Sequence, residues 1–206
     1  MGLFDRTPGK GNPFDWLVVG LGNPGKEYER TRHNVGAECV ALLADRHGSA
    51  LKAGRDNALV AEVRIGTGGD APRAALAFPL TYMNESGRSV AALVRRYRIE
   101  SPEQIIVVQD ELDLEPGTLK LKRGGGLAGH NGLRSITHHL KTQDYLRIRI
   151  GVGKPPNKDR GASHVLTRVP KRQRELLDTV VAEAADAVEA IIVDGIEPAM
   201  SRYNAR

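Results

Sequence analysis

The sequence is poor in cysteine, in aromatic side chains and in long apolar runs. Cys39 is the only cysteine among 206 residues, so no internal disulfide can form and a reducing compartment fits the chain. Aromatic residues make up 4% of the sequence, which disfavours a nucleic-acid binder that works mainly by stacking bases on rings. No apolar stretch approaches the roughly 20 residues of a membrane span, and residues 1–15 lack the apolar segment of a signal peptide. We therefore expect a cytoplasmic protein without a membrane anchor.

The charge balance is basic but not extreme. Thirty Lys and Arg against 25 Asp and Glu give a formal net charge of +5. Such a balance is compatible with a polyanionic partner, but nucleic-acid binding needs a cluster of cations and not only an excess. Composition alone therefore leaves the partner open.

Apolar patterns predict one α/β domain over residues 16–206, preceded by a flexible arm at 1–15 that is rich in Gly and Pro. Short apolar runs at 16–20 and 104–110 indicate buried strands, and periods of three and four residues indicate helices. Strand and helix patterns alternate along the chain, which favours a twisted, mixed and mostly parallel sheet flanked by helices. The predicted helices cover about 34–47, 84–98, 129–140 and 171–194, and 153–162 is predicted to be a mobile loop.

The first strand runs into Gly20-Leu21-Gly22-Asn23-Pro24-Gly25, which matches the glycine spacing of a dinucleotide-binding loop. Pro24 removes a backbone N–H that such a loop would offer to phosphate, and no strand about 20 residues later ends in the acid that binds ribose. A tight turn after the strand, or a turn that presents Asn23 to a substrate, agrees better with these residues.

His33 stands at the predicted start of a helix, where the helix dipole disfavours an imidazolium and keeps the ring basic. A neutral imidazole can take a proton from water. The alternative is a structural histidine at the helix start that is held by a backbone contact, and the sequence pattern does not distinguish the two. Asp110 ends the strand at 104–110, at the sheet edge where ligands bind in open α/β folds, and could orient His33. The alternative is a solvated acidic turn formed by Asp110 with Glu111 and Asp113.

Other chemistries find less support in the sequence. Cys39 lies six residues after His33, about 240° around a helix, and shares the apolar face of Val35 and Leu42, so it is expected in the core. The six histidines form no HExxH pair and join no cysteine cluster, and no GxSxG motif is present. A metal site is therefore not expected.

Four blocks of the sequence resemble the bacterial peptidyl-tRNA hydrolases. They are VVGLGNPGKEYERTRHNVG at 18–36, TYMNESG at 81–87, DELDLEPG at 110–117 and GGGLAGHNGLRSI at 124–136, and the resemblance runs from Trp16 to the C-terminal helix. It implies hydrolysis of the ester between the peptide and the 3′ ribose of tRNA, which recycles tRNA during translation. It also implies a monomer that needs neither metal nor cofactor. Tyr82 and the pair Leu127-Ala128 depart from the residues often found at those positions.

The resemblance assigns roles at matching positions. His33 corresponds to the catalytic base, Asp110 to the acid that stabilises its basic form, and Asn23 to the residue that discriminates N-blocked from free aminoacyl groups. The positions that match substrate-contacting residues are Tyr28, Tyr82, Met83, Asn84 and Asn131. The positions that match a basic patch for tRNA phosphate are Lys120, Lys122 and Arg149.

Each of these positions also has a purely structural interpretation. Loop asparagines commonly stabilise turns, Met83 suits a core, and cations on alternating strands commonly face solvent. Three competing functions stay open: a non-catalytic RNA-binding relative, a nucleotide-binding α/β protein, and an esterase that does not need RNA.

Overall fold

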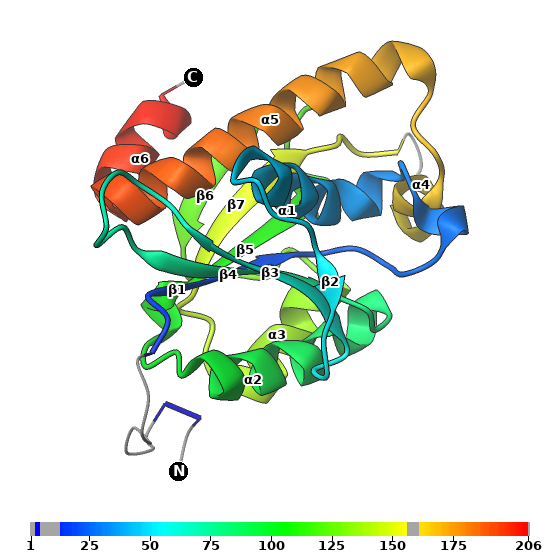
Figure 1. Ribbon diagram of the computed structural model, residues 1–206. Coiled ribbons are helices and arrows are strands. Elements are labelled where there is room, and N and C mark those ends of the chain that lie inside the picture. The colour runs from blue at the N-terminus through cyan, green and yellow to red at the C-terminus, as the bar shows by residue number, and fades with distance from the viewer. Residues whose placement is uncertain (1–2, 5–12, 156–160, 206) are drawn as a thin grey trace.

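The computed structural model describes residues 3–4, 13–155 and 161–205. Within them, seven strands form one sheet in the order β2-β3-β4-β1-β5-β7-β6 (Figure 1). The four central strands run parallel to one another, and they are β4 (Arg73–Pro79), β1 (Trp16–Gly20), β5 (Ile105–Glu111) and β7 (Leu146–Gly151). Antiparallel strands complete both edges, namely β3 (Ala58–Arg64) with β2 (Lys52–Ala53) on one side and β6 (Leu119–Arg123) on the other.

Helices cover both faces of this sheet. One face carries α1 (Val35–Arg46), α5 (Lys171–Asp194) and α6 (Ile196–Asn204), and the opposite face carries α2 (Ser86–Tyr97) and α3 (Asn131–Leu140) (Figure 1). The short α4 (Gly161–Leu166) lies near the N-terminal end of α1. The predicted fold class, a mixed sheet flanked by helices in one α/β domain, is confirmed.

The central strand β5 shows why the predicted run of Ile and Val is continuous. All seven of its residues are buried, because helices pack on both faces of the strand. Ile106 and Val108 join the core beneath α1 and α5, whereas Ile105 and Val107 join the core above α2 and α3. The strand runs one residue past the predicted 104–110, so Asp110 is the last residue but one of a strand whose position is fixed from both sides.

The glycine-rich segment after β1 serves close packing between this strand and α1. A Cβ atom at Gly20 would lie 2.1 Å from the carbonyl oxygen of Gly36, and a Cβ at Gly36 would lie 2.2 Å from the carbonyl oxygen of Val108. Because neither position has room for a methyl group, α1 can begin directly against β1 and β5. Gly20 is therefore required for the packing of α1 against the sheet.

The structure differs from the sequence prediction near the C-terminus and in one loop. Gly195 (φ 90°) ends α5 as predicted, but α5 is not the last helix, since α6 starts directly after this glycine. Residues 161 and 162, predicted as loop, belong to α4, while 156–160 of that loop lie outside the described residues. Of the predicted arm at 1–15, residues 1–2 and 5–12 lie outside them, and Phe14 already packs in the core against Tyr97.

The C-terminal helix α6 covers the outer edge of the sheet. The side chain of Asn204 accepts a hydrogen bond from Leu121 N (2.8 Å) and donates one to Leu121 O (2.9 Å). The ammonium group of Lys120 donates to the carbonyl oxygen of Asn204 (2.8 Å). On its outer side, the edge strand β6 is thereby hydrogen-bonded to a side chain instead of to another strand. Among the described helices, none has the length and apolarity that crossing a bilayer requires.

Replacing Gly36 with Ala should destabilise the fold, because the new methyl group would overlap the backbone of β5. We expect a loss of roughly 3 kcal/mol, at the upper end of the cost of overpacking. Chemical denaturation monitored by circular dichroism measures it. Gly69→Ala is the control, since a Cβ there meets no atom within 4 Å. Equal stability of the two variants would contradict the packing argument.

Candidate active site

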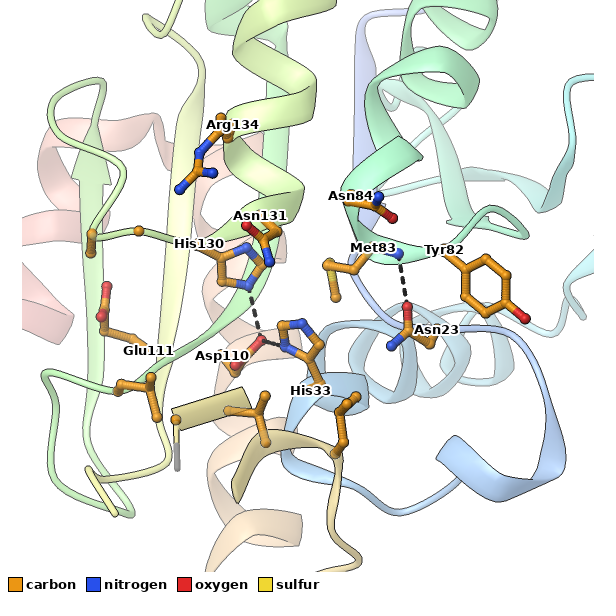
Figure 2. A pocket seen from close by; sticks show the side chains of 16 residues that line it. Asn23, His33, Tyr82, Met83, Asn84, Asp110, Glu111, His130, Asn131 and Arg134 are labelled. Atoms are coloured by element: carbon orange, nitrogen blue, oxygen red, sulfur yellow. Dashed lines mark hydrogen bonds and ion pairs between the residues drawn. The ribbon is translucent and has the colours of Figure 1, made fainter. Parts of the chain in front are cut away.

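A cleft of about 760 Å³ opens at the carboxyl ends of the parallel strands (Figure 2). Segments that follow β1 and β4, together with the end of β5, supply Asn23, Met83 and Asp110 to its lining. Strand β1 lies between β4 and β5 in the sheet. After β1 the chain builds β2, β3 and β4 on one side of it, and then crosses to build β5 on the other side. Ligands bind at this kind of crevice in open α/β sheets.

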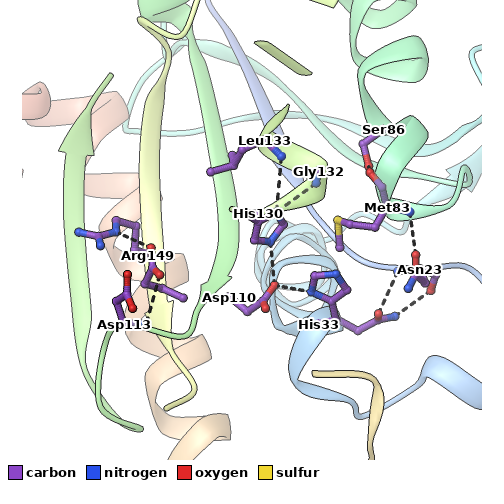
Figure 3. A network of polar contacts seen from close by, with 12 residues as sticks. Asn23, His33, Met83, Ser86, Asp110, Asp113, His130, Gly132, Leu133 and Arg149 are labelled. Atoms are coloured by element: carbon purple, nitrogen blue, oxygen red, sulfur yellow. Dashed lines mark hydrogen bonds and ion pairs between the residues drawn. The ribbon is translucent and has the colours of Figure 1, made fainter. Parts of the chain in front are cut away.

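Two histidines converge on one carboxylate oxygen at the floor of the cleft. Nδ1 of His33 lies 2.8 Å from Oδ1 of Asp110, and Nε2 of His130 lies 3.0 Å from the same oxygen (Figure 3). His33 belongs to a 3₁₀ turn, Arg32–Asn34, that leads into α1, and His130 directly precedes α3. The contact predicted between residues 33 and 110 is present, and a second histidine joins it.

The contacts of His130 define which of its ring nitrogens carries the proton. Its Nδ1 faces the backbone N–H groups of Gly132 (3.1 Å) and Leu133 (3.4 Å), so it accepts hydrogen bonds and caps the N-terminus of α3. A neutral imidazole with an accepting Nδ1 carries its proton on Nε2. His130 therefore donates from Nε2 to Asp110.

Asp110 is 97% buried and yet ionised. Burial by itself would raise the pKa of this carboxyl, but attraction to His33 and His130, with their hydrogen bonds, outweighs burial and holds the pKa below its usual range. A carboxylate only accepts hydrogen bonds, so Nδ1 of His33 carries a proton as well. The lone pair of His33 is then on Nε2, which points into the cleft (Figure 2).

His33, Asp110 and His130 also form a group whose ligand atoms could surround a metal ion, since they all lie within 4.8 Å of one another. The capping role of His130 argues against this use of the group. A metal at Nε2 would displace the proton that the neutral ring carries there while Nδ1 accepts from the backbone. The cluster therefore has the geometry of a hydrogen-bonded relay.

Asn23 is held in one orientation at the edge of the cleft. Its Oδ1 accepts a hydrogen bond from the backbone N–H of Met83 (2.8 Å), which leaves the amide NH₂ as the free end of the side chain. The buried Asn34 fixes the backbone of Asn23 on both sides, by accepting from Asn23 N and donating to Asn23 O, each at 2.9 Å. The segment therefore presents a hydrogen-bond donor at a fixed position.

The other amides line the cleft from two different elements. Asn84 lies in the 3₁₀ turn Met83–Glu85 before α2, and Asn131 is the first residue of α3. Met83 is buried in the wall between them, and Tyr82 stands exposed at the rim. Of the predicted substrate-contacting residues, these four line the cleft, and Tyr28 does not.

The predicted phosphate-binding cations lie outside the cleft lining, on β6 and β7. Lys122 and Arg149 are on the sheet face that carries α3, with Lys122 against Gly125 and Nε of Arg149 3.0 Å from Oε2 of Glu111. Lys120 is on the same face, but its ammonium is bound to Asn204. The three residues thus have different surroundings although they alternate regularly in the sequence.

Several residues of the site were not predicted from the sequence. His130 gives no signal as a helix cap, because a ring nitrogen in that role is rare beside Ser, Thr, Asp and Asn. Arg134 and an apolar wall on the side of α4 also line the cleft, the wall consisting of Leu112, Val165 and Leu166. The sequence prediction started this helix at about residue 129, which placed His130 within the first turn and not at the cap that it forms before Asn131.

Comparison with known proteins connects this chain to one family. The family model described as peptidyl-tRNA hydrolase matches residues 17–206. The peptidyl-tRNA hydrolase of Frankia alni is 51% identical over 92% of this chain and 94% of its own length, and that of Cutibacterium acnes is 48% identical over 92% and 98%. The crystal structure of peptidyl-tRNA hydrolase from Acinetobacter baumannii has a TM-score of 0.85 and 38% identity, covering 95% of this chain and 98% of that one.

The tautomer of His130 can be measured directly. In a ¹⁵N-detected NMR spectrum of the histidine rings at pH 7, we expect Nδ1 of His130 unprotonated and Nε2 protonated, because the α3 N-terminus donates to Nδ1. His130→Ala identifies the signal. A proton on Nδ1 would contradict both the capping role and the direction of the bond to Asp110. The exposed His138, on the same helix, is the control for the assignment of the ring signals.

Proposed function

This chain belongs to the peptidyl-tRNA hydrolase family, and we propose from that membership that it hydrolyses the ester bond joining a peptide to the 3′ ribose of tRNA. The observation that carries the proposal is the pair formed by His33 and Asp110. Nδ1 of His33 faces the buried carboxylate at 2.8 Å, and Nε2 is left as a base in the cleft. The reaction needs a base for water, and this geometry supplies one.

The proposed mechanism starts with a water molecule between Nε2 of His33 and the ester carbonyl. His33 removes a proton as the water oxygen attacks the carbonyl carbon, and the imidazolium that forms is stabilised by Asp110. The tetrahedral intermediate collapses, its C–O bond to the ribose breaks, and the proton passes from His33 to the ribose oxygen. His130 acts through Asp110, since its Nε2–H holds the carboxylate in place. No step requires a metal or another cofactor.

Amide donors suit the charge that develops on the carbonyl oxygen. Asn84 and Asn131 are exposed amides on opposite elements of the cleft, and each can donate without adding a charge. We assign to them, together with Met83 and Tyr82 in the wall, the binding of the peptide and of the terminal nucleotide.

Asn23 supports selectivity for N-blocked substrates. A blocked aminoacyl group has a carbonyl oxygen next to its nitrogen, which the NH₂ of Asn23 can bind, whereas a free aminoacyl group has an ammonium that only donates. Because Met83 fixes the orientation of the amide, a donor would face a donor when the amine is free. The same residue type in a freely rotating loop could not discriminate in this way.

The competing functions fit the site less well. A non-catalytic RNA-binding relative has no need for a buried carboxylate that orients a base. A dinucleotide site after β1 would need the glycines that already accommodate α1. The proposal extends to tRNA phosphate, for which Lys122 and Arg149 offer cations beside the cleft, and to a monomer in the cytoplasm, where the substrate is made.

His33→Ala should lower kcat for N-acetyl-aminoacyl-tRNA by about 10²–10⁴-fold with little change in KM, because the base contributes to the transition state and not to binding. A filter assay of acid-precipitable label measures the rate. His138→Ala is the control, a histidine of exposed surface. Wild-type activity of the His33 variant would refute the role of the base.

Asn23→Asp should reduce the preference for blocked over free aminoacyl-tRNA by at least about tenfold, because a carboxylate oxygen accepts from an ammonium instead of opposing it. The measurement is the ratio of kcat/KM for N-acetyl-aminoacyl-tRNA and aminoacyl-tRNA. Asn57→Asp, in a loop that does not line the cleft, should leave the ratio unchanged. An unaltered ratio in the Asn23 variant would remove the residue from selectivity.

A further inference from the structure

Arg134 is the only lysine or arginine among the described residues that line the cleft. It lies in α3, four residues after His130 and three after Asn131. Residues four apart on a helix share a face and have Cβ atoms about 5–6 Å apart. Arg134 therefore stands one helical turn from the residue that holds Asp110, on the same wall of the cleft (Figure 2).

The guanidinium of Arg134 has no hydrogen bond or ion pair within the described part of the chain. The acids of the cleft are already engaged, since Asp110 binds both histidines, and Glu111 binds Arg149 and the backbone N–H of Asp113. Figure 2 shows the side chain extended away from α3 toward the side where Glu111 lies. The cleft wall thus carries an exposed guanidinium that is available to bind an anionic ligand.

The substrate of the proposed function brings one anion close to the reacting bond. The ribose that carries the peptide ester is attached through its 5′ oxygen to a phosphate, so a single sugar separates that charge from the ester. A guanidinium can bind two oxygens of such a phosphate at once, which gives direction as well as attraction. A cation one turn above the His130–Asp110 contact is suitably placed for it.

We propose that Arg134 binds the phosphate on the 5′ side of the 3′-terminal nucleotide and thereby sets the ester against His33. This inference rests on the proposed function and deepens it. Lys122 and Arg149 have a different task, because they lie on β6 and β7 outside the cleft lining, and Arg149 is engaged with Glu111. They suit phosphates farther along the tRNA, whereas Arg134 meets the one that enters with the scissile bond.

The test removes one charge from each side of the contact. The substrates are N-acetyl-aminoacyl acceptor-stem RNAs with a normal 3′ end, or with a neutral methylphosphonate in place of the last internucleotide phosphate. A third RNA has the same replacement one linkage earlier. The enzymes are wild type, Arg134→Gln and, as the matched control, Lys141→Gln, which removes an exposed cation just beyond the other end of α3.

Arg134→Gln should lower kcat/KM on the normal RNA by about 10–100-fold, the range of hydrogen bonds to charged groups. Neutralising the last phosphate should cost wild type a similar factor and cost the variant almost nothing more, because the two changes remove one interaction. The slope of log(kcat/KM) against log salt concentration should fall by about 0.7 in Arg134→Gln, the value for one contact to single-stranded RNA. Lys141→Gln should behave as wild type on all three RNAs.

Independent losses that multiply would overturn the assignment, as would coupling to the earlier phosphate instead of the last one. An Arg134→Gln variant as active as wild type would overturn it too. Failure of the proposed function has a different signature, since wild type would then leave even the normal RNA and full-length N-acetyl-aminoacyl-tRNA intact. Thermal unfolding of Arg134→Gln close to that of wild type separates a binding effect from a folding defect.

Discussion

The organisation of this protein depends on one buried carboxylate oxygen, Oδ1 of Asp110, that receives hydrogen bonds from two histidines. His33 comes from the side of the sheet covered by α1, and His130 comes from the side covered by α3. The end of β5 lies between them, so a single charged oxygen joins both helical layers at the point where the cleft opens. An unpaired charge at this depth would cost far more than the fold could tolerate, and two donors remove that cost. The same pairing leaves Nε2 of His33 free as a base. The contact between His33 and Asp110 therefore contributes both to the stability of the fold and to the chemistry of the site.

The direction of the hydrogen bond between His130 and Asp110 follows from the helix that begins beside His130. The N–H groups at the start of α3 make Nδ1 of His130 an acceptor, which forces a proton onto Nε2 and toward Asp110. Asp110 then accepts from both rings, and His33 is left with its lone pair in the cleft. The N–H groups at the start of α3 thus act on His33 through two intervening residues, His130 and Asp110.

Much of this architecture could be predicted from the sequence, because alternating and periodic apolar residues report burial directly. The strand predicted at 104–110 and found at 105–111, and the helix at 171–194, were predictable for that reason. The position of Asp110 near a strand end only suggested that it could orient His33, because the proximity of the two residues depends on the fold. His130 was missed because its role depends on a ring nitrogen capping a helix, a contact that the usual capping signals do not cover. The surroundings of Lys120 were missed because they depend on α6, a helix that was not predicted and that starts directly after the glycine that ends α5. Tyr28 was expected near the substrate, yet its 3₁₀ turn keeps it outside the cleft lining.

At the outer edge of the sheet, the carboxamide of Asn204 takes the place of the backbone of a neighbouring strand. It satisfies both backbone groups of Leu121 as a neighbouring strand would, but it offers no further edge on which another chain could assemble. Protection of this edge against edge-to-edge aggregation therefore depends on a few atoms near the end of α6, a helix remote in sequence from β6. The same helix accepts a hydrogen bond from the ammonium of Lys120, so fraying of α6 would open a sheet edge and remove one contact of a cation on the face where RNA is expected.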